Sequence, residues 1–219
     1  MSNILVLLES NNNSLKRVSL ELITAANSLS SQSGAKIYGL LIDADGANAA
    51  ISAEYGLANV IVAKTGNSQY SSTAFSSVVA QVAKNINADV LLFAANAAGL
   101  EIAPRVAVKL SAGYIADCTA LSFENNDIIA KKPVYAGKSL ITTSVSTAVK
   151  IFSLRPNVFT AQKTDSVAQN ISEFTAELSA NDSAVKVVNL MKNEGKLDVL
   201  EADVVVSGGR GIKGPEHYY

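Results

Sequence analysis

Short apolar runs and longer amphipathic stretches alternate along the first half of the chain. Four apolar runs have the length and composition of buried strands: residues 4–8, 36–42, 59–63 and 89–95. After each run, apolar residues recur at the spacing of one helix face, in residues 14–33, 47–55, 71–85 and 99–110. Because strands that alternate with helices are joined by right-handed crossovers, this pattern predicts a parallel sheet covered by helices.

Individual residues set the expected helix ends. Ser14, which follows the polar loop of residues 10–13, is predicted to begin the first helix, and Gly34 to end it. Gly56 closes the short second helix. Pro104 fits a helix only near its first turn, so the fourth helix is expected to begin near Gly99.

The pattern changes after Gly113. Four strand-like segments separated by turn residues predict an antiparallel meander: residues 118–124, 128–133, 138–143 and 149–154. Residues 161–170 read as a loop, and residues 171–178 and 185–191 as further strands. The predicted fold class is therefore α/β, with a Rossmann-like parallel sheet flanked by helices (adenine-nucleotide-hydrolase-like) and an appended antiparallel β meander.

The last stretch differs from the rest. Residues 193–195 look like a linker, residues 197–201 like a short helix and residues 204–206 like a strand, so we expect one domain over 1–192 and the start of another over 193–219. The strand runs into a glycine-rich turn, in which Gly209, Arg210 and Gly211 are candidates for anion binding. A strand and such a turn without a following helix make half a site.

Composition narrows the functional classes. The chain of 219 residues is 48% hydrophobic, has a formal net charge of -1 and contains no tryptophan. Nothing in this balance favours nucleic acid or an anionic membrane as a partner. The amino terminus lacks a signal-peptide pattern, and no apolar run reaches the roughly 20 residues that span a bilayer. A soluble, cytoplasmic protein is expected.

Catalytic chemistry finds little support. His217 is the single histidine and Cys118 the single cysteine, so a Ser-His-Asp triad, a disulfide and a histidine-rich metal site are disfavoured. Cys118 reads as a small buried hydrophobe. Glu101 and Arg105 lie one helical turn apart, where a surface ion pair is expected. Arg155, before Pro156, is either a buried structural arginine, which we favour, or an interdomain contact.

Five motifs, in order, resemble the alpha subunit of electron transfer flavoproteins. The first motif is the strand at residues 6–9. The other four are GLEIAPRVA at residues 99–107, KPVYAG at 132–137, LRPNVF at 154–159 and SGGRG at 207–211. Each motif alone is weak, but their shared order is specific. Lys132 stands where the family has arginine, and His217 where it commonly has asparagine.

The resemblance implies a heterodimer with a beta subunit. It also implies an FAD that accepts electrons from flavin dehydrogenases, such as the acyl-CoA dehydrogenases of fatty acid β-oxidation, and passes them to a respiratory or other acceptor. Such a protein is an electron carrier, not a catalyst with its own substrate. The resemblance further implies that the first domain of the alpha subunit holds no FAD. Residues 10–13 are consistent with this, because the loop that follows the first strand lacks the G-x-G-x-x-G sequence that binds a pyrophosphate.

The site residues follow from the same resemblance. Arg210, with Gly209 and Gly211, matches the turn that opens the family's FAD domain, which normally continues for roughly another hundred residues, one domain's length. The FAD site is therefore expected to be incomplete in this chain, and within it Arg210 is expected to be a solvated loop residue. Tyr135 is placed either at the subunit interface, which we expect in the antiparallel region after Gly113, or in the core. The alternative function is a stand-alone nucleotide-binding or sensor module.

Overall fold

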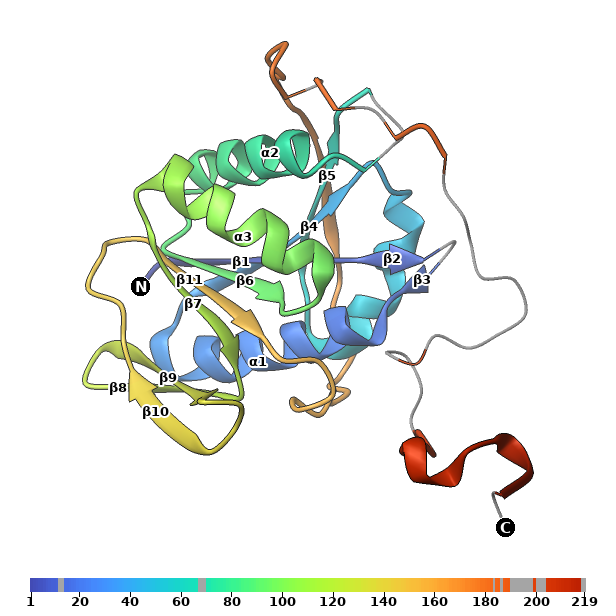
Figure 1. Ribbon diagram of the computed structural model, residues 1–219. Helices are drawn as coiled ribbons and strands as arrows, with labels where there is room; N and C mark the ends of the chain where they lie inside the picture. Colours follow the sequence, from blue (N-terminus) through green and yellow to red (C-terminus); the bar gives the residue numbers. More distant parts are fainter. Residues whose placement is uncertain are drawn as a thin grey trace. The chain divides into compact units, whose positions relative to one another are not determined.

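The computed structural model describes residues 1–11, 14–66, 70–182, 184–185, 187–189, 199 and 204–217. The chain divides into two compact units, Met1–Val187 and Val188–Tyr219, and each is described by itself. The first unit contains every strand of the described residues (Figure 1).

The first unit is built on a seven-stranded sheet in the order β12-β5-β4-β1-β6-β11-β7. Every neighbouring pair in it is parallel, as the alternation of strands and helices predicts. Its strands are β1 (Asn3–Leu7), β4 (Lys36–Ile42), β5 (Asn59–Lys64), β6 (Val90–Ala94), β7 (Gly113–Cys118), β11 (Lys150–Leu154) and β12 (Asn170–Thr175).

Helices cover both faces of this sheet (Figure 1). Helix α1 (Arg17–Ser33) and the 3₁₀ helix η1 (Gly46–Tyr55) lie on one face, and α2 (Ser72–Asn85) and α3 (Ala97–Leu110) lie on the other. Side chains alternate across the strands, so each face has its own core. In β1, Ile4 packs toward α1, whereas Leu5 packs toward α2 and α3.

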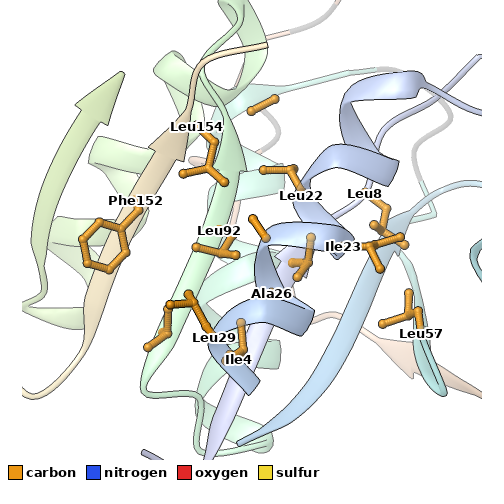
Figure 2. Close-up of a cluster of buried hydrophobic side chains, with 14 of the residues drawn as sticks. Ile4, Leu8, Leu22, Ile23, Ala26, Leu29, Leu57, Leu92, Phe152 and Leu154 are labelled. Atoms are coloured by element: carbon orange, nitrogen blue, oxygen red, sulfur yellow. The ribbon is translucent and has the colours of Figure 1, made fainter. Parts of the chain in front are cut away.

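The core on the α1 face is mainly aliphatic, with the ring of Phe152 from β11 among its members (Figure 2). It brings Leu22, Ile23 and Ala26 of α1 against Ile4 and Leu92 of the sheet, and all five are 0–1% exposed. Full burial of such a side chain contributes about 1.5–3 kcal/mol. The helical spacing of the apolar residues in α1 is therefore what fixes the helix on the sheet.

The predicted four-stranded meander is wrong in its last strand. Three strands do form an antiparallel sheet: β8 (Ala120–Glu124), β9 (Asp127–Val134) and β10 (Ser139–Thr143). The fourth segment is β11, which lies between β6 and β7 in the parallel sheet. Ile151 and Phe152 are consecutive residues of β11, and both are fully buried, on opposite faces of the sheet. This is the pattern of a central parallel strand.

Two helix starts also differ from expectation. Helix α1 begins at Arg17, because Ser14 and Leu15 form β3 (Ser14–Leu15), which pairs with β2 (Ser10–Asn11). Helix α3 begins at Ala97, so Pro104 lies inside it, past its first turn. Pro104 is on the exposed side of the helix, where water can reach the carbonyl group that loses its hydrogen bond.

The Gly34 and Gly56 predictions are confirmed. Both residues have a positive φ, 72° and 81°, and each ends the preceding helix, although the second of these helices is 3₁₀ and not α. The further strand predicted over residues 171–178 is confirmed in its first part as β12 (Asn170–Thr175), at the opposite edge of the sheet from β7, whereas residues 176–178 lie outside the strand.

The second unit contains two short 3₁₀ turns, η2 (Arg210–Ile212) and η3 (Pro215–His217). Residues 204–206, predicted as a strand, are irregular and exposed, because no described residue pairs with them. The described residues of 185–191 are not in a strand either. The described residues do not include the predicted linker 193–195. They also leave out Lys186, Leu190, Met191 and all of residues 197–201 except Val199.

Candidate functional site

The candidate site is a cavity at the carboxyl edge of the parallel sheet. It measures about 210 Å³ and lies where β1 and β4 end, beside the start of α3. Its walls are largely apolar, with Leu41, Phe75 and Ile102 among them, and Glu9 and Lys16 supply charge. Ligands of open parallel sheets bind at this edge, so its polar groups decide which chemistry is possible.

Glu9 organises the polar end of the cavity. Its two carboxylate oxygens accept hydrogen bonds from Asn96 Nδ2 at 2.8 and 2.9 Å, and Lys16 Nζ lies 3.3 Å from Oε2. Asn96 Oδ1 in turn accepts from the N–H of Gly99 at 3.0 Å and so caps α3. Ser19 fixes the backbone of Glu9, because its hydroxyl accepts from the N–H and donates to the C=O.

These residues were not among the sequence-predicted site residues. A signal for them exists, because Glu9 and Asn96 each follow a buried strand almost directly. The sequence does not reveal that their strands, β1 and β6, are neighbours. Their meeting depends on strand order.

The aromatic wall of the cavity carries a second polar group. Tyr70 packs edge-on against Phe75, with ring centroids 5.2 Å apart, and its hydroxyl donates to Glu101 at 2.9 Å. Burial, followed by the bond to Glu101, raises the pKa of Tyr70. Hydrogen bonds from Ser72 and Tyr70 lower the pKa of Glu101.

The predicted ion pair between Glu101 and Arg105 is wrong. Among the described residues, no ion pair joins the two, and Arg105 contributes only the smallest of the effects on the pKa of Glu101. Tyr70, from the segment before α2, offers the carboxylate a closer partner.

A separate polar group lies at the carboxyl ends of β7 and β11. Arg155 donates from Nε to Asp117 Oδ1 at 2.8 Å and from its terminal nitrogen to Oδ2, a bidentate arrangement. This bond holds the pKa of Asp117 below its usual value. Both partners lie within the first unit, which supports the structural role expected for Arg155. The expected burial is wrong, because the Arg155 side chain is 42% exposed.

Cys118, at the end of β7, is fully buried, and burial raises the pKa of its thiol to about 12. The prediction of a small buried hydrophobe is confirmed. Because the thiolate is the reactive form, Cys118 is not a nucleophile in the folded chain.

The predicted cofactor residues lie in the second unit, whereas the cavity lies in the first. Gly209, Arg210 and Gly211 are exposed, and a Cβ added at either glycine would meet open space. The chemistry of the donors suits a phosphate, since Arg210 is a cation and the flanking glycines leave backbone N–H groups accessible. The described residues do not wall these donors in, so they form no enclosed cradle and we derive no flavin chemistry from them.

Tyr135 resolves one of the alternatives left open by the sequence. It is 80% exposed at the turn between β9 and β10, so the core placement is wrong. Leu140 and Ile141 of β10 are also exposed, at 67% and 40%, and β10 is an edge strand. An apolar edge therefore faces outward from the antiparallel sheet.

Two classes of site find no support in the described part of the chain. None of its helices combines the length and apolar character needed to cross a membrane. Within the same residues, no three side chains among His, Cys, Asp and Glu are grouped closely enough to hold a metal ion.

Comparison with known proteins assigns the family. The model of the electron transfer flavoprotein domain matches residues 4–179. Similar proteins include Protein FixB of Clostridium saccharobutylicum, 29% identical over 97% of this chain and 65% of the relative. They also include the electron transfer flavoprotein subunit alpha of Bacillus subtilis, 28% identical over 98% of this chain and 66% of the relative.

A third relative belongs to an enzyme complex by its name. It is the lactate dehydrogenase (NAD(+),ferredoxin) subunit LctC of Acetobacterium woodii, 28% identical over 90% of this chain and 48% of the relative. The chain spans about two thirds of the length of the FixB and subunit alpha relatives. The matches confirm the resemblance indicated by the five motifs, and the chain belongs to the electron transfer flavoprotein family.

Proposed function

We propose that the chain is part of the alpha subunit of a heterodimeric electron transfer flavoprotein. In this role it takes electrons from flavin dehydrogenases through FAD and passes them to a respiratory or other acceptor. The observation that carries the proposal is the family match over residues 4–179, which includes all of the parallel sheet except Asn3. The relatives' names, subunit alpha among them, agree. The proposal includes the cytoplasmic location that is expected from the sequence.

The first unit serves this function as a scaffold. The charged groups at the carboxyl edge of its sheet are engaged with one another: Glu9 with Asn96 and Lys16, and Asp117 with Arg155. The single cysteine is buried with a raised pKa. These arrangements favour a carrier subunit over a catalyst with its own substrate.

Arg210, Gly209 and Gly211 contribute to the FAD site in this proposal. Their exposure in the second unit is compatible with a site that other residues complete. Arg210 supplies the positive charge for a phosphate of the cofactor, and the glycines allow close approach of the backbone.

The beta subunit binds at the antiparallel sheet. Strand β10 leaves one edge of that sheet unpaired within the described residues, and Tyr135, Leu140 and Ile141 make the edge apolar. An apolar edge strand without a cover invites association, so a partner subunit stabilises it.

Co-expression with the beta subunit of the same organism tests the proposal. A 1:1 complex is expected on gel filtration, and Leu140→Lys is expected to weaken it, because the lysine places a charge in an apolar contact. Val108→Lys is the matched control, since Val108 is 82% exposed on α3. Two separate peaks for the unmodified proteins, or equal effects of the two substitutions, contradict the proposed interface.

The Acetobacterium woodii relative favours a second candidate, a subunit of a dehydrogenase complex. Assays of the purified complex distinguish the two. A carrier reduces a dye only when a flavin dehydrogenase and its substrate are added. A complex with its own dehydrogenase activity needs only the substrate and its acceptors.

A further inference from the structure

The order of strands creates a particular position at the carboxyl edge of the sheet. From β1 the chain crosses to β4 on one side, and it later returns to β6 on the other side. The loops that follow β1 and β6 therefore lead away in opposite directions. In sheets of this type the ligand binds in the crevice between such loops, with its phosphate at the start of a helix.

In this chain a side chain already occupies that position. The Glu9 carboxylate bridges the two loops, with hydrogen bonds of 2.8 and 2.9 Å from Asn96 Nδ2. Lys16 Nζ, 3.3 Å away, neutralises it. The Glu9 side chain is only 16% exposed, so this is an interior contact and not a solvated surface pair.

The groups around Glu9 are those that would hold a phosphate. Lys16 is a cation, Asn96 Nδ2 is a donor, and Asn96 also caps α3, whose N-terminus carries partial positive charge. A phosphate brought to these donors would lie beside the carboxylate and would be repelled by its charge. Glu9 thus occupies the hydrogen-bond donor of Asn96 and the cation of Lys16, and its negative charge repels a phosphate.

We propose that Glu9 takes the place of a ligand phosphate, so that the carboxylate closes the crevice of the first unit to nucleotides and other phosphates. The link from Glu9 to Asn96 then holds the ends of β1 and β6 together, as a bound ligand would. The cavity that remains beside it is lined by Leu41, Phe75 and Ile102 and offers no further cation besides Lys16 among the residues that line it.

The test is to remove the carboxylate and measure phosphate binding to the 219-residue chain. Inorganic phosphate and adenosine 5′-monophosphate are titrated calorimetrically into the wild type and into Glu9→Ala at constant ionic strength. Glu9→Ala frees both the donors and the space, and it is expected to bind each probe with a Kd about tenfold lower or more. Glu9→Gln, which keeps the volume but loses the charge, is expected to lie between the two.

Two variants locate the effect. Glu9→Ala combined with Lys16→Ala is expected to lose the gained affinity, because the cation is gone. Glu173→Ala is the matched control, since Glu173 pairs with Lys64 at the β12 edge, at 2.7 Å, and does not line the cavity. The proposal is overturned if the wild type binds the probes as tightly as Glu9→Ala, or if Glu173→Ala shows the same gain.

Glu9→Ala is also expected to be less stable than the wild type, because Asn96 and Lys16 lose their partner. The thermal unfolding of both proteins is therefore measured in phosphate and in chloride of equal ionic strength. Phosphate stabilises folded proteins in general, but where it replaces the carboxylate it raises the midpoint of Glu9→Ala by more than that of the wild type. Equal shifts for the two proteins overturn the proposal.

Discussion

At the residue scale, Glu21 is a carboxylate that the fold buries at a cost. Its side chain, on α1, is 4% exposed, and Oε2 accepts the N–H of Asn157 at 2.9 Å. Burial raises the pKa of Glu21, and the bond from Asn157 and the charge of Arg17 offset this only in part. The carboxyl group therefore prefers its neutral form in the folded chain more than in the unfolded chain.

The sign of the pH dependence follows. Because the folded pKa is raised, the contribution of Glu21 to stability is fully present below the unfolded pKa and is lost as the pH rises through the folded pKa. At neutral pH the ionised group lowers the stability. Glu21→Gln, which has the same shape and can still accept from Asn157, is expected to raise the melting temperature at pH 7 and to flatten its dependence on pH above 4.

Thermal unfolding between pH 4 and 8 measures this effect. Glu21→Ala is the control, because it leaves the N–H of Asn157 without its acceptor and is expected to destabilise the chain by about 1–3 kcal/mol. A Glu21→Gln variant as unstable at pH 7 as Glu21→Ala would show that the charge itself, and not the hydrogen bond, is needed.

At the element scale, the segment after β12 is held to α2 by a short series of polar contacts. Gln81 exchanges hydrogen bonds with the backbone of Glu177, at 2.6 and 3.0 Å. Asp182 accepts from Ser77 at 2.6 Å, and its backbone carbonyl accepts from Thr73 at 3.0 Å. Few buried apolar contacts support this segment, so these bonds decide whether it stays in place.

Asp182→Ala is expected to release this segment without unfolding the sheet. Hydrogen exchange in residues 177–182 should become faster, while exchange in β1 and β6 is unchanged and the melting temperature falls by no more than a few degrees. Asp165→Ala, at an exposed position before β12, is the control and should leave exchange as it is. Faster exchange throughout the first unit would mean that Asp182 supports the whole fold.

Elements were predictable from sequence where one local pattern determines them. The spacing in α1 and the apolar runs of β1, β4, β5 and β6 specify both type and face. The segment of residues 149–154 was assigned to the wrong sheet because a short apolar run does not reveal its neighbours. Only its burial on both faces, between β6 and β7, distinguishes a central strand from a meander strand.

The candidate site was less predictable for the same reason. Glu9 and Asn96 are 87 residues apart, and no local pattern joins them. Pro104 shows that a local rule can also be overridden by packing. The rule placed Pro104 near a helix start, but the packing of Ile102 and Val106 on the sheet keeps it inside α3.

At the scale of the whole molecule, the two units differ in how much they can bind by themselves. At the carboxyl edge of the sheet in the first unit, Glu9 is paired with Lys16, and Asp117 with Arg155. Arg210 in the second unit is instead exposed between two glycines. The 219-residue chain is therefore expected to bind FAD weakly and to lose it on gel filtration. In the complete heterodimer, by contrast, retention of FAD is expected to depend on Arg210.

Titration of FAD into the full-length heterodimer, followed by flavin fluorescence, tests this dependence. A charge-assisted hydrogen bond contributes roughly 1.5–3 kcal/mol, so Arg210→Ala is expected to raise the Kd about tenfold or more. Arg105→Ala, which removes a cation from the exposed side of α3, should leave the Kd unchanged. Equal constants for the two variants would show that Arg210 is a solvated loop residue. About one tightly held flavin per molecule of the 219-residue chain alone would contradict the weak binding expected of it. That result would mean that the 219 residues already contain a complete site, with its donors in the first unit.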